Sequence, residues 1–235
     1  MKKYLIIVVS CMAVLLTLNE LYFYNGDFYL PVSSKITCIS KAEDGLLYLD
    51  EGSGFEEFDL KGVNLGMGKP GHFAADLAIT KEEYLRWFQQ IQEMGANVIR
   101  IYTIANPEFY EAFYEYNLHR PSPLYLIHGV WVSEDLMNSS YSALDESFYL
   151  PFLESCKDTV DVIHGRFKQR TNQHLLPNHY QWDISPWLYG YILGTEWKGD
   201  LVVFTNDCLP QAEQFQGEYL YTDCLLYTSP SPRDS

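Results

Sequence analysis

Residues 95–103, with the sequence Gly-Ala-Asn-Val-Ile-Arg-Ile-Tyr-Thr, decide the predicted fold. The run from Val98 to Ile104 is β-branched and is interrupted by Arg100, a pattern typical of a strand buried on both faces. Upstream, Thr80 and Glu83 have the spacing of a capping box, and apolar residues then follow at helical spacing up to the glycine that opens the quoted stretch. The sequence therefore predicts a helix that leads directly into a buried strand.

The same alternation of strand and helix continues on both sides of this strand. The predicted strands are Gly62–Gly66, Val98–Ile104, Leu124–Val132 and Gly190–Thr195. One predicted helix begins after Thr80, and a second begins after Asn106, with Pro107 in its first turn. A third spans Tyr149–Ile163. This order is the signature of a parallel α/β sheet. A doubly wound fold would place a phosphate-binding loop and a helix directly after its first strand, but Gly66 and Thr80 are well separated. We therefore favour a (β/α)8 TIM barrel.

A whole TIM barrel needs about 250 residues, and this chain has room for four strands before it ends. The expected fold is thus a barrel truncated after about strand four, preceded by a small hairpin from the short alternating segments Ile36–Ser40, Gly45–Asp50 and Glu56–Leu60. The expected division of the chain is residues 1–24 as a signal anchor or signal peptide, 25–60 as linker and hairpin, 61–223 as the half barrel, and 224–235 as an artefact.

The amino terminus has the pattern of an export signal. Lys2 and Lys3 precede fifteen residues, Tyr4–Leu18, that carry no charge. This run is shorter than the roughly 20 residues that cross a bilayer, so an uncleaved anchor, a cleaved signal and a lipoprotein signal ending at Cys11 all stay open. The two lysines would remain in the cytoplasm, which predicts a domain that faces outward at the cell membrane or is secreted.

The carboxyl-terminal residues resemble the translation of a sequencing adapter. Cys224–Asp234 can be back-translated, codon by codon, into the adapter of transposon-based sequencing libraries. We expect that the natural coding sequence departs from this one near Asp223. A genuine Ser/Pro-rich tail is the alternative.

Composition excludes several classes of function. The formal charge of −15, with no basic run, argues against nucleic acid as a partner. The histidines have no metal-binding spacing, and Cys38, Cys156 and Cys208 form neither a zinc motif nor an even disulfide set. No nucleophile-elbow or Walker motif is present, which argues against a serine hydrolase or a P-loop enzyme. We expect no metal and no cofactor. The 16% aromatic content suits sugar-ring stacking and aromatic-rich cores equally.

Six segments together resemble the clan of retaining glycoside hydrolases built on TIM barrels, near the cellulase-like and β-galactosidase-like families. They are Phe55–Gly66 (FEEFDLKGVNLG), Gly95–Thr103 (GANVIRIYT), Pro123–Trp131 (PLYLIHGVW), Asp161–Gly165 (DVIHG), Trp182–Pro186 (WDISP) and Gly190–Trp197 (GYILGTEW). The similarity spans roughly residues 45–220, and its most specific part is GANVIRIY after a capped helix. It implies that the chain is the amino-terminal half of such a barrel, whose partner is a β-linked oligosaccharide or polysaccharide.

The resemblance also implies residue roles. Retaining hydrolysis uses two carboxyl groups at the carboxyl-terminal rim of the barrel, and Glu196, after the fourth strand, matches the general acid/base. Packing against Trp197 would raise the pKa of that carboxyl group. Arg100 matches the arginine that orients the nucleophile, with a structural ion pair as the alternative, and Asn64 ends the first strand at the rim. The nucleophile itself, expected after a seventh strand, has no counterpart.

Other side chains near the predicted rims are candidates to line the sugar subsites, and core packing is an equal alternative for each: Tyr102, His128, Trp131 and, beside the acid, Trp197. The clan usually has Asn before the acid, where this chain has Thr195, so sugar preference stays open. This departure also keeps a catalytically inactive, carbohydrate-binding barrel as the second hypothesis. A scaffold for other envelope proteins is the third.

Overall fold

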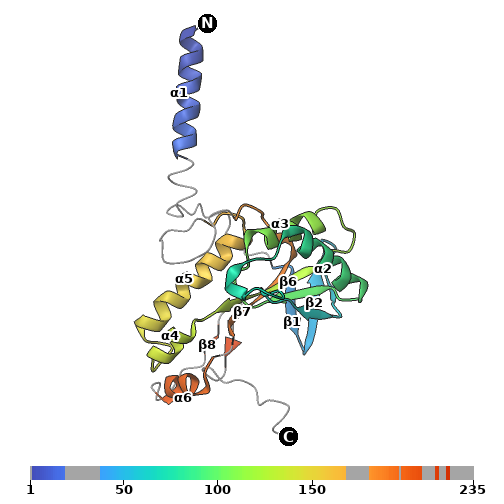
Figure 1. Cartoon of the computed structure of the whole chain (residues 1–235), viewed down its shortest axis with the longest axis vertical. Helices are drawn as coiled ribbons and strands as arrows, with labels where there is room; N and C mark the ends of the chain where they lie inside the picture. The colour runs from blue at the N-terminus through green and yellow to red at the C-terminus, as the bar shows by residue number, and fades with distance from the viewer. Residues whose placement is uncertain are drawn as a thin grey trace. The chain divides into compact units, whose positions relative to one another are not determined.

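The computed structural model describes residues 2–18, 38–167, 180–195, 197–207, 215–216 and 221–222 (Figure 1). The chain divides into two compact units, of which the first comprises residues 1–128 and 160–190 and the second residues 129–159 and 191–235. The predicted general acid Glu196, Cys208 and the adapter-like residues 224–235 lie outside the described residues.

Four strands form a parallel sheet in chain order: β4 (Gly62–Asn64), β5 (Val98–Ile101), β6 (Tyr125–Trp131) and β7 (Leu188–Thr195). β4 and β6 flank β5, and Val98 is paired with Gly62 on one side and with Tyr125 on the other. Helices connect the successive strands, as the sequence predicted. The molecule is therefore a mixed α/β protein.

One face of the sheet in the first unit is covered by α2 (Lys81–Glu93) and α3 (Pro107–Asn117). The two helices lie next to each other (Figure 1). They pack through edge-to-face contacts of Phe88 with Phe109 and Phe113. Ile99 and Ile101 are fully buried beneath them, in one apolar core that also holds the end of α5 (Glu146–Ile163). This core explains why the predicted strand is apolar on this face.

The caps of these two helices differ in chemistry. Thr80 and Glu83 form the predicted capping box at α2, because the Thr80 hydroxyl accepts from Glu83 N–H and the Glu83 carboxylate accepts from Thr80 N–H. At α3, Asn106 is the N-cap residue and Pro107 is in the first turn, as expected, but the Asn106 side chain makes no cap hydrogen bond. It accepts instead from Tyr84 Oη at 2.9 Å and donates to Ile79 O at 2.7 Å, which ties three segments together.

The other face is covered, near the amino-terminal ends of the strands, by an antiparallel sheet of β1 (Ser40–Glu43), β2 (Leu46–Asp50) and β3 (Phe55–Glu57). Leu49 packs with Val98, Tyr125 and Tyr189, each at or near the start of its strand. Ser40 Oγ donates a hydrogen bond to Tyr189 O. The predicted hairpin is thus a three-stranded sheet that covers this end of the parallel sheet.

The second unit has a small core of its own. It contains α4 (Glu134–Ser139) and α6 (Gly199–Asp207), together with the first turns of α5 and the ends of β6 and β7. The buried residues of this core are Val132, Met137, Phe148 and Leu201. The short strands β8 (Phe215–Gln216) and β9 (Tyr221–Thr222) pair antiparallel in the same unit.

The boundaries of several predicted elements shift, and some elements were not predicted. The strand predicted at Ile36–Ser40 is observed at Ser40–Glu43, and the one predicted at Glu56–Leu60 ends at Glu57. Phe58 and Leu60 instead turn inward onto the core beneath the hairpin. The sequence predicted neither α4 nor α6, nor the short 3₁₀ helices η2 (Ala74–Asp76) and η3 (Ser185–Trp187).

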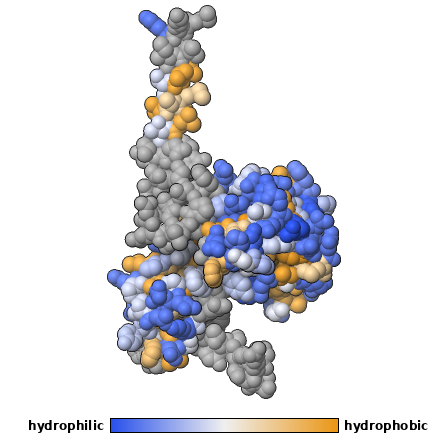
Figure 2. All heavy atoms as spheres, viewed as in Figure 1, coloured by the Kyte–Doolittle hydropathy of each residue, from blue (hydrophilic) through white to orange (hydrophobic). Residues whose placement is uncertain are grey.

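The amino-terminal helix α1 (Lys2–Leu18) exposes apolar side chains along its length, among them Ile7, Met12 and Leu15 (Figure 2). In the part of the chain that the structure describes, no helix combines the length and the hydropathy that a membrane span requires. Export remains a prediction from the sequence.

Candidate functional site

Asn64 and Arg100 lie side by side at the carboxyl ends of β4 and β5. They are directly paired in the parallel ladder, and the backbone of the next residue, Leu65, donates to Arg100 O at 2.9 Å. Residues paired in a ladder point to the same face of a sheet, so both side chains lie on the face opposite α2 and α3. The structure thus brings together two of the residues that the sequence singled out.

Arg100 is half-buried, and its guanidinium lies over the ring of Tyr102 at 4.6 Å, a cation–π contact. Its Nε is buried and has no hydrogen-bond partner among the described residues, nor does Arg100 form an ion pair with any of them. A buried N–H that lacks an acceptor costs free energy. The guanidinium is therefore suited to a carboxylate or to another acceptor.

His128 lies on the opposite face of the sheet from Arg100. It is paired with Ile101 in the ladder, it is fully buried, and its Nε2 is 2.8 Å from Tyr110 Oη. Ala105 N donates to the same hydroxyl, and Tyr180 Oη donates to Ala105 O at 2.7 Å. Of the two readings of His128 that the sequence left open, these contacts fit core packing.

Trp131 and Trp197 belong to the second unit. Trp131 ends β6 and is 41% exposed, as a ligand-contacting side chain would be. Trp197 is half-buried against the rings of Phe148 and Phe152, at 5.2 and 5.6 Å between centroids. Its indole Nε1 is buried without an acceptor among the described residues, which leaves this donor available.

A left-handed glycine precedes Trp197. Gly194, near the end of β7, has φ +73°, and a Cβ atom at this position would lie 2.0 Å from Trp197 Nε1. Only a residue without a side chain fits both the backbone angle and the space. Thr195 and the predicted acid Glu196 therefore come directly after a position in β7 that requires glycine.

The titratable groups in these cores are perturbed mainly by burial. Burial raises the pKa values of Tyr84, Tyr110 and Tyr180, so their hydroxyls remain protonated donors. Among the described residues, no three His, Cys, Asp or Glu side chains converge in a way that could hold a metal ion.

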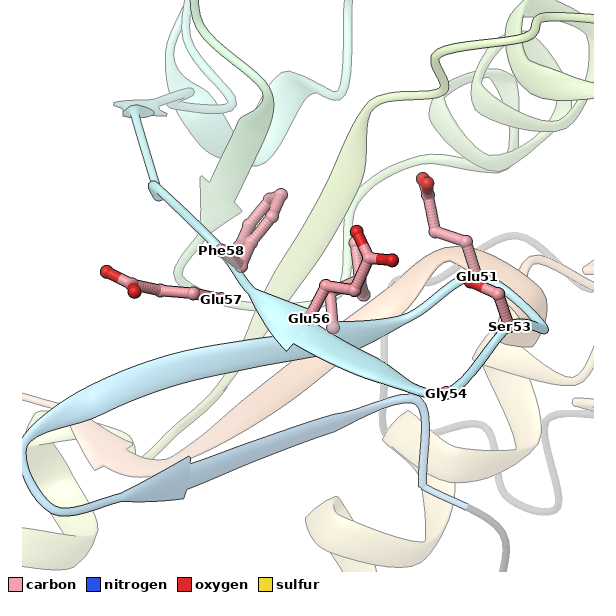
Figure 3. Close-up of a pocket in the computed structure, with 7 residues that line it drawn as sticks. Glu51, Ser53, Gly54, Glu56, Glu57 and Phe58 are labelled. Carbon is pink, nitrogen blue, oxygen red and sulfur yellow. The ribbon is translucent and has the colours of Figure 1, made fainter.

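A polar pocket of about 130 Å³ lies on the hairpin (Figure 3). It is lined by Leu49, Glu51, Ser53, Gly54, Glu56, Glu57 and Phe58. The side chains of Glu51 and Glu56 project on the same side in Figure 3, and Tyr125 Oη donates to Glu51 at 2.7 Å. The three glutamates are exposed and solvated, so we assign this pocket no function.

Two features of these regions were missed from the sequence. One is the positive φ of Gly194, for which the Gly-Thr-Glu-Trp order after a predicted strand was an available signal. The other is Phe73, an aromatic side chain displayed in the loop after β4, which the Pro70-Gly71 turn signal could have located.

Comparison of the chain with protein-family models, with curated proteins and with solved structures finds no match.

Proposed function

We propose that the chain is the amino-terminal half of an exported retaining glycoside hydrolase or transglycosylase that acts on β-linked saccharides, with Glu196 as general acid/base. The observation that carries the proposal is the position of Glu196, the residue directly after β7 in a sheet of four parallel strands. Active sites of parallel α/β barrels lie at the carboxyl ends of the strands, where a residue directly after β7 is expected.

Asn64 and Arg100, in the first unit, also lie toward the carboxyl ends of their strands, where parallel α/β barrels have their active sites. Asn64 is the last residue of β4 and Arg100 the last but one of β5; both lie on the face away from the helices, and Arg100 Nε lacks an acceptor among the described residues. In a barrel this face is the interior, and a second carboxylate from a later strand would complete the pairing of Arg100. Two carboxyl groups about 5 to 5.5 Å apart are what retaining hydrolysis requires.

The TIM barrel is part of this proposal. The parallel order β4-β5-β6-β7, with helices on one face and a hairpin beneath the amino-terminal ends of the strands, is compatible with half of such a barrel. An open sheet with the same four strands would bind its ligand at the same edge. Because Glu196 follows β7 directly, the proposed role of Glu196 fits a barrel and an open sheet alike.

The test is a matched pair of substitutions in the protein expressed from its complete gene. Glu196→Gln keeps the shape of the side chain but removes its acid, and we expect the turnover of β-linked oligosaccharides to fall by roughly 100-fold or more. Asp200→Asn, an exposed position in the first turn of α6, is the control and should keep turnover within about twofold. Unchanged turnover in Glu196→Gln would remove Glu196 from the mechanism.

A catalytically inactive, carbohydrate-binding barrel is the second candidate. The observation that favours it is Thr195, which stands where the resembled clan has Asn beside the acid. This candidate predicts saccharide binding without hydrolysis in the wild-type protein. A Glu at the end of a seventh strand in the complete gene would favour the enzyme, and its absence would favour the binding protein.

A further inference from the structure

Phe73 is the most exposed large apolar side chain of the described residues. It is 84% exposed, in the loop between β4 and α2. A Phe side chain stabilises a fold mainly through the apolar area that it buries, so this ring contributes little to the fold. Isolated exposed apolar residues are common on protein surfaces, so exposure alone gives Phe73 no role.

The loop holds Phe73 through defined hydrogen bonds. His72 N donates to Lys69 O at 3.0 Å across Pro70 and Gly71, and Gly71 has φ +83°, as a type II turn requires. Phe73 N then donates to Asp76 Oδ2 at 2.8 Å, and Asp76 N donates to Phe73 O at 3.0 Å. The backbone on both sides of the ring is thus satisfied by local partners.

The loop is also fastened to α2. Lys69 Nζ lies 2.8 Å from Glu83 Oε2, and the same oxygen accepts from Thr80 N–H in the capping box. This ion pair is only partly exposed, with 18% and 25% of the two side chains accessible. The ring is therefore displayed on a turn tied to a helix, a preorganised arrangement that lowers the entropic cost of binding.

The location of Phe73 relates it to the candidate site. The loop begins directly after β4, the strand that ends at Asn64, so it leaves the sheet at the edge where Asn64 and Arg100 lie side by side. All of these residues belong to the first unit. A ligand at the Asn64 and Arg100 edge would have Phe73 in the adjoining loop.

The surroundings of the ring indicate what kind of ligand would contact it. No other exposed large apolar residue lies in the loop, whereas His72 and Asp76 beside it are exposed polar groups. One ring offers far less than the several hundred Å² of apolar surface that mark a protein interface. A ring with a polar rim suits a small ligand that has an apolar face and polar edges.

We propose that Phe73 is a stacking platform for one pyranose ring of a β-linked oligosaccharide, some distance from the scissile bond; this inference rests on the proposed function. A pyranose whose ring substituents are all equatorial, as in gluco- and xylo-configured sugars, presents axial C–H bonds on both faces. These bonds meet the electron-rich face of the ring, while the equatorial hydroxyls remain in reach of polar groups. The substrate class is therefore an oligosaccharide of such units, long enough to extend beyond the reacting sugar.

The test measures binding rather than turnover. Calorimetric titrations use the protein from its complete gene in the Glu196→Gln background, with β-1,3- and β-1,4-linked glucose and xylose hexasaccharides as probes. Phe73→Ala should weaken the tightest complex about tenfold, and Phe73→Trp, which keeps a stacking face, should retain it. Phe55→Ala is the matched control, because Phe55 is an exposed Phe in the hairpin strand β3 and should leave binding unchanged.

The outcomes separate this inference from the proposed function. Equal binding by Phe73→Ala, an equal loss in Phe55→Ala, or no binding of any hexasaccharide would overturn the platform, even if the wild-type protein hydrolyses glycosides. Binding that depends on Phe73 in a protein without hydrolytic activity would uphold the platform and overturn the hydrolase. Circular dichroism of each variant establishes that it is folded.

Discussion

Tyr110 and His128 form a hydrogen bond of 2.8 Å between fully buried side chains on the helix-covered face of the sheet. The Tyr110 hydroxyl already accepts from Ala105 N–H, so its own proton is available to His128 Nε2. This geometry suits a neutral His128 whose Nε2 acts as the acceptor. A buried polar pair of this kind stabilises the first unit only while both partners are present.

Tyr110→Phe should therefore lower the free energy of unfolding by about 1–3 kcal/mol, because Ala105 N–H and His128 Nε2 both lose a partner in the core. Urea denaturation of the protein from its complete gene measures this change. Tyr114→Phe in the same helix is the control, since the Tyr114 hydroxyl has no hydrogen bond to any described residue. Equal stability of the two variants would contradict the role given to this pair.

Gly194→Ala should destabilise the protein by about 2–4 kcal/mol, because the new methyl group meets the Trp197 indole and an L-residue is strained at φ +73°. Gly199→Ala is the matched control, since a Cβ at Gly199, the first residue of α6, meets nothing within 4 Å. Thermal unfolding followed by tryptophan fluorescence compares the two. A Gly194→Ala variant as stable as Gly199→Ala would show that this position of β7 tolerates a side chain.

The proposed acid role of Glu196 predicts a dependence on the leaving group. Glu196→Ala should slow natural-type substrates by roughly 100-fold or more and slow activated aryl glycosides less in the first step, because a good leaving group needs little proton donation. Added azide should restore part of the rate by taking the place of the missing base. Stopped-flow and steady-state assays of the complete protein measure both effects, and equal losses on both substrates would argue against an acid role.

His164 predicts a dependence of stability on pH. Burial, and then the charge of Arg166, lower its pKa, while Asp183 and Asp161 oppose the shift. The folded state then binds fewer protons than the unfolded state, so this contribution to stability is complete above about pH 6.5 and is lost as the pH falls below that value. In His164→Gln, the midpoint of urea denaturation should change less between pH 7 and pH 5 than it does in the wild-type protein. If the urea midpoint of the variant depends on pH as steeply as that of the wild type, His164 is not the source of this dependence.

The predicted orientation of the chain can be tested on intact cells. Lys2 and Lys3 ahead of the apolar run predict that residues beyond about Asn25 lie outside the cell. Protease added to intact cells should therefore remove the domain and leave an epitope placed at the extreme amino terminus protected. A domain that stays intact until the cells are lysed would overturn this orientation.

Local signals predicted the elements best. The capping box of Thr80 and Glu83 is observed with both of its hydrogen bonds, because it depends on residues only three positions apart. The strand predicted at Val98–Ile104 was also found, although it ends at Ile101; Val98, Ile99 and Ile101 are buried, which is why its sequence is apolar. α6 was not predicted because Val202, Val203 and Phe204 have strand propensity, and its buried contacts come from Leu201 and Thr205.

The candidate site was harder to predict, because the face of a strand changes at every residue. The sequence placed Arg100 and His128 near neighbouring rims, but the ladder pairs Arg100 with Ile127, and His128 falls one position later on the opposite face. Periodicity in an apolar run does not reveal which face a single polar residue takes. The register between strands, which is a tertiary property, decided it.

The hairpin sheet has a consequence for how the protein is made. Ser40, at the start of β1, donates to the carbonyl of Tyr189, a residue 149 positions later in the chain. At bacterial and eukaryotic translation rates, Tyr189 leaves the ribosome roughly 7 to 30 seconds after Ser40. During this interval Leu49 and Phe58 lack the side chain of Tyr189, which belongs to the same core in the folded protein. The nascent chain therefore offers chaperones an early, temporary binding segment, and it loses that segment once β7 has been synthesised.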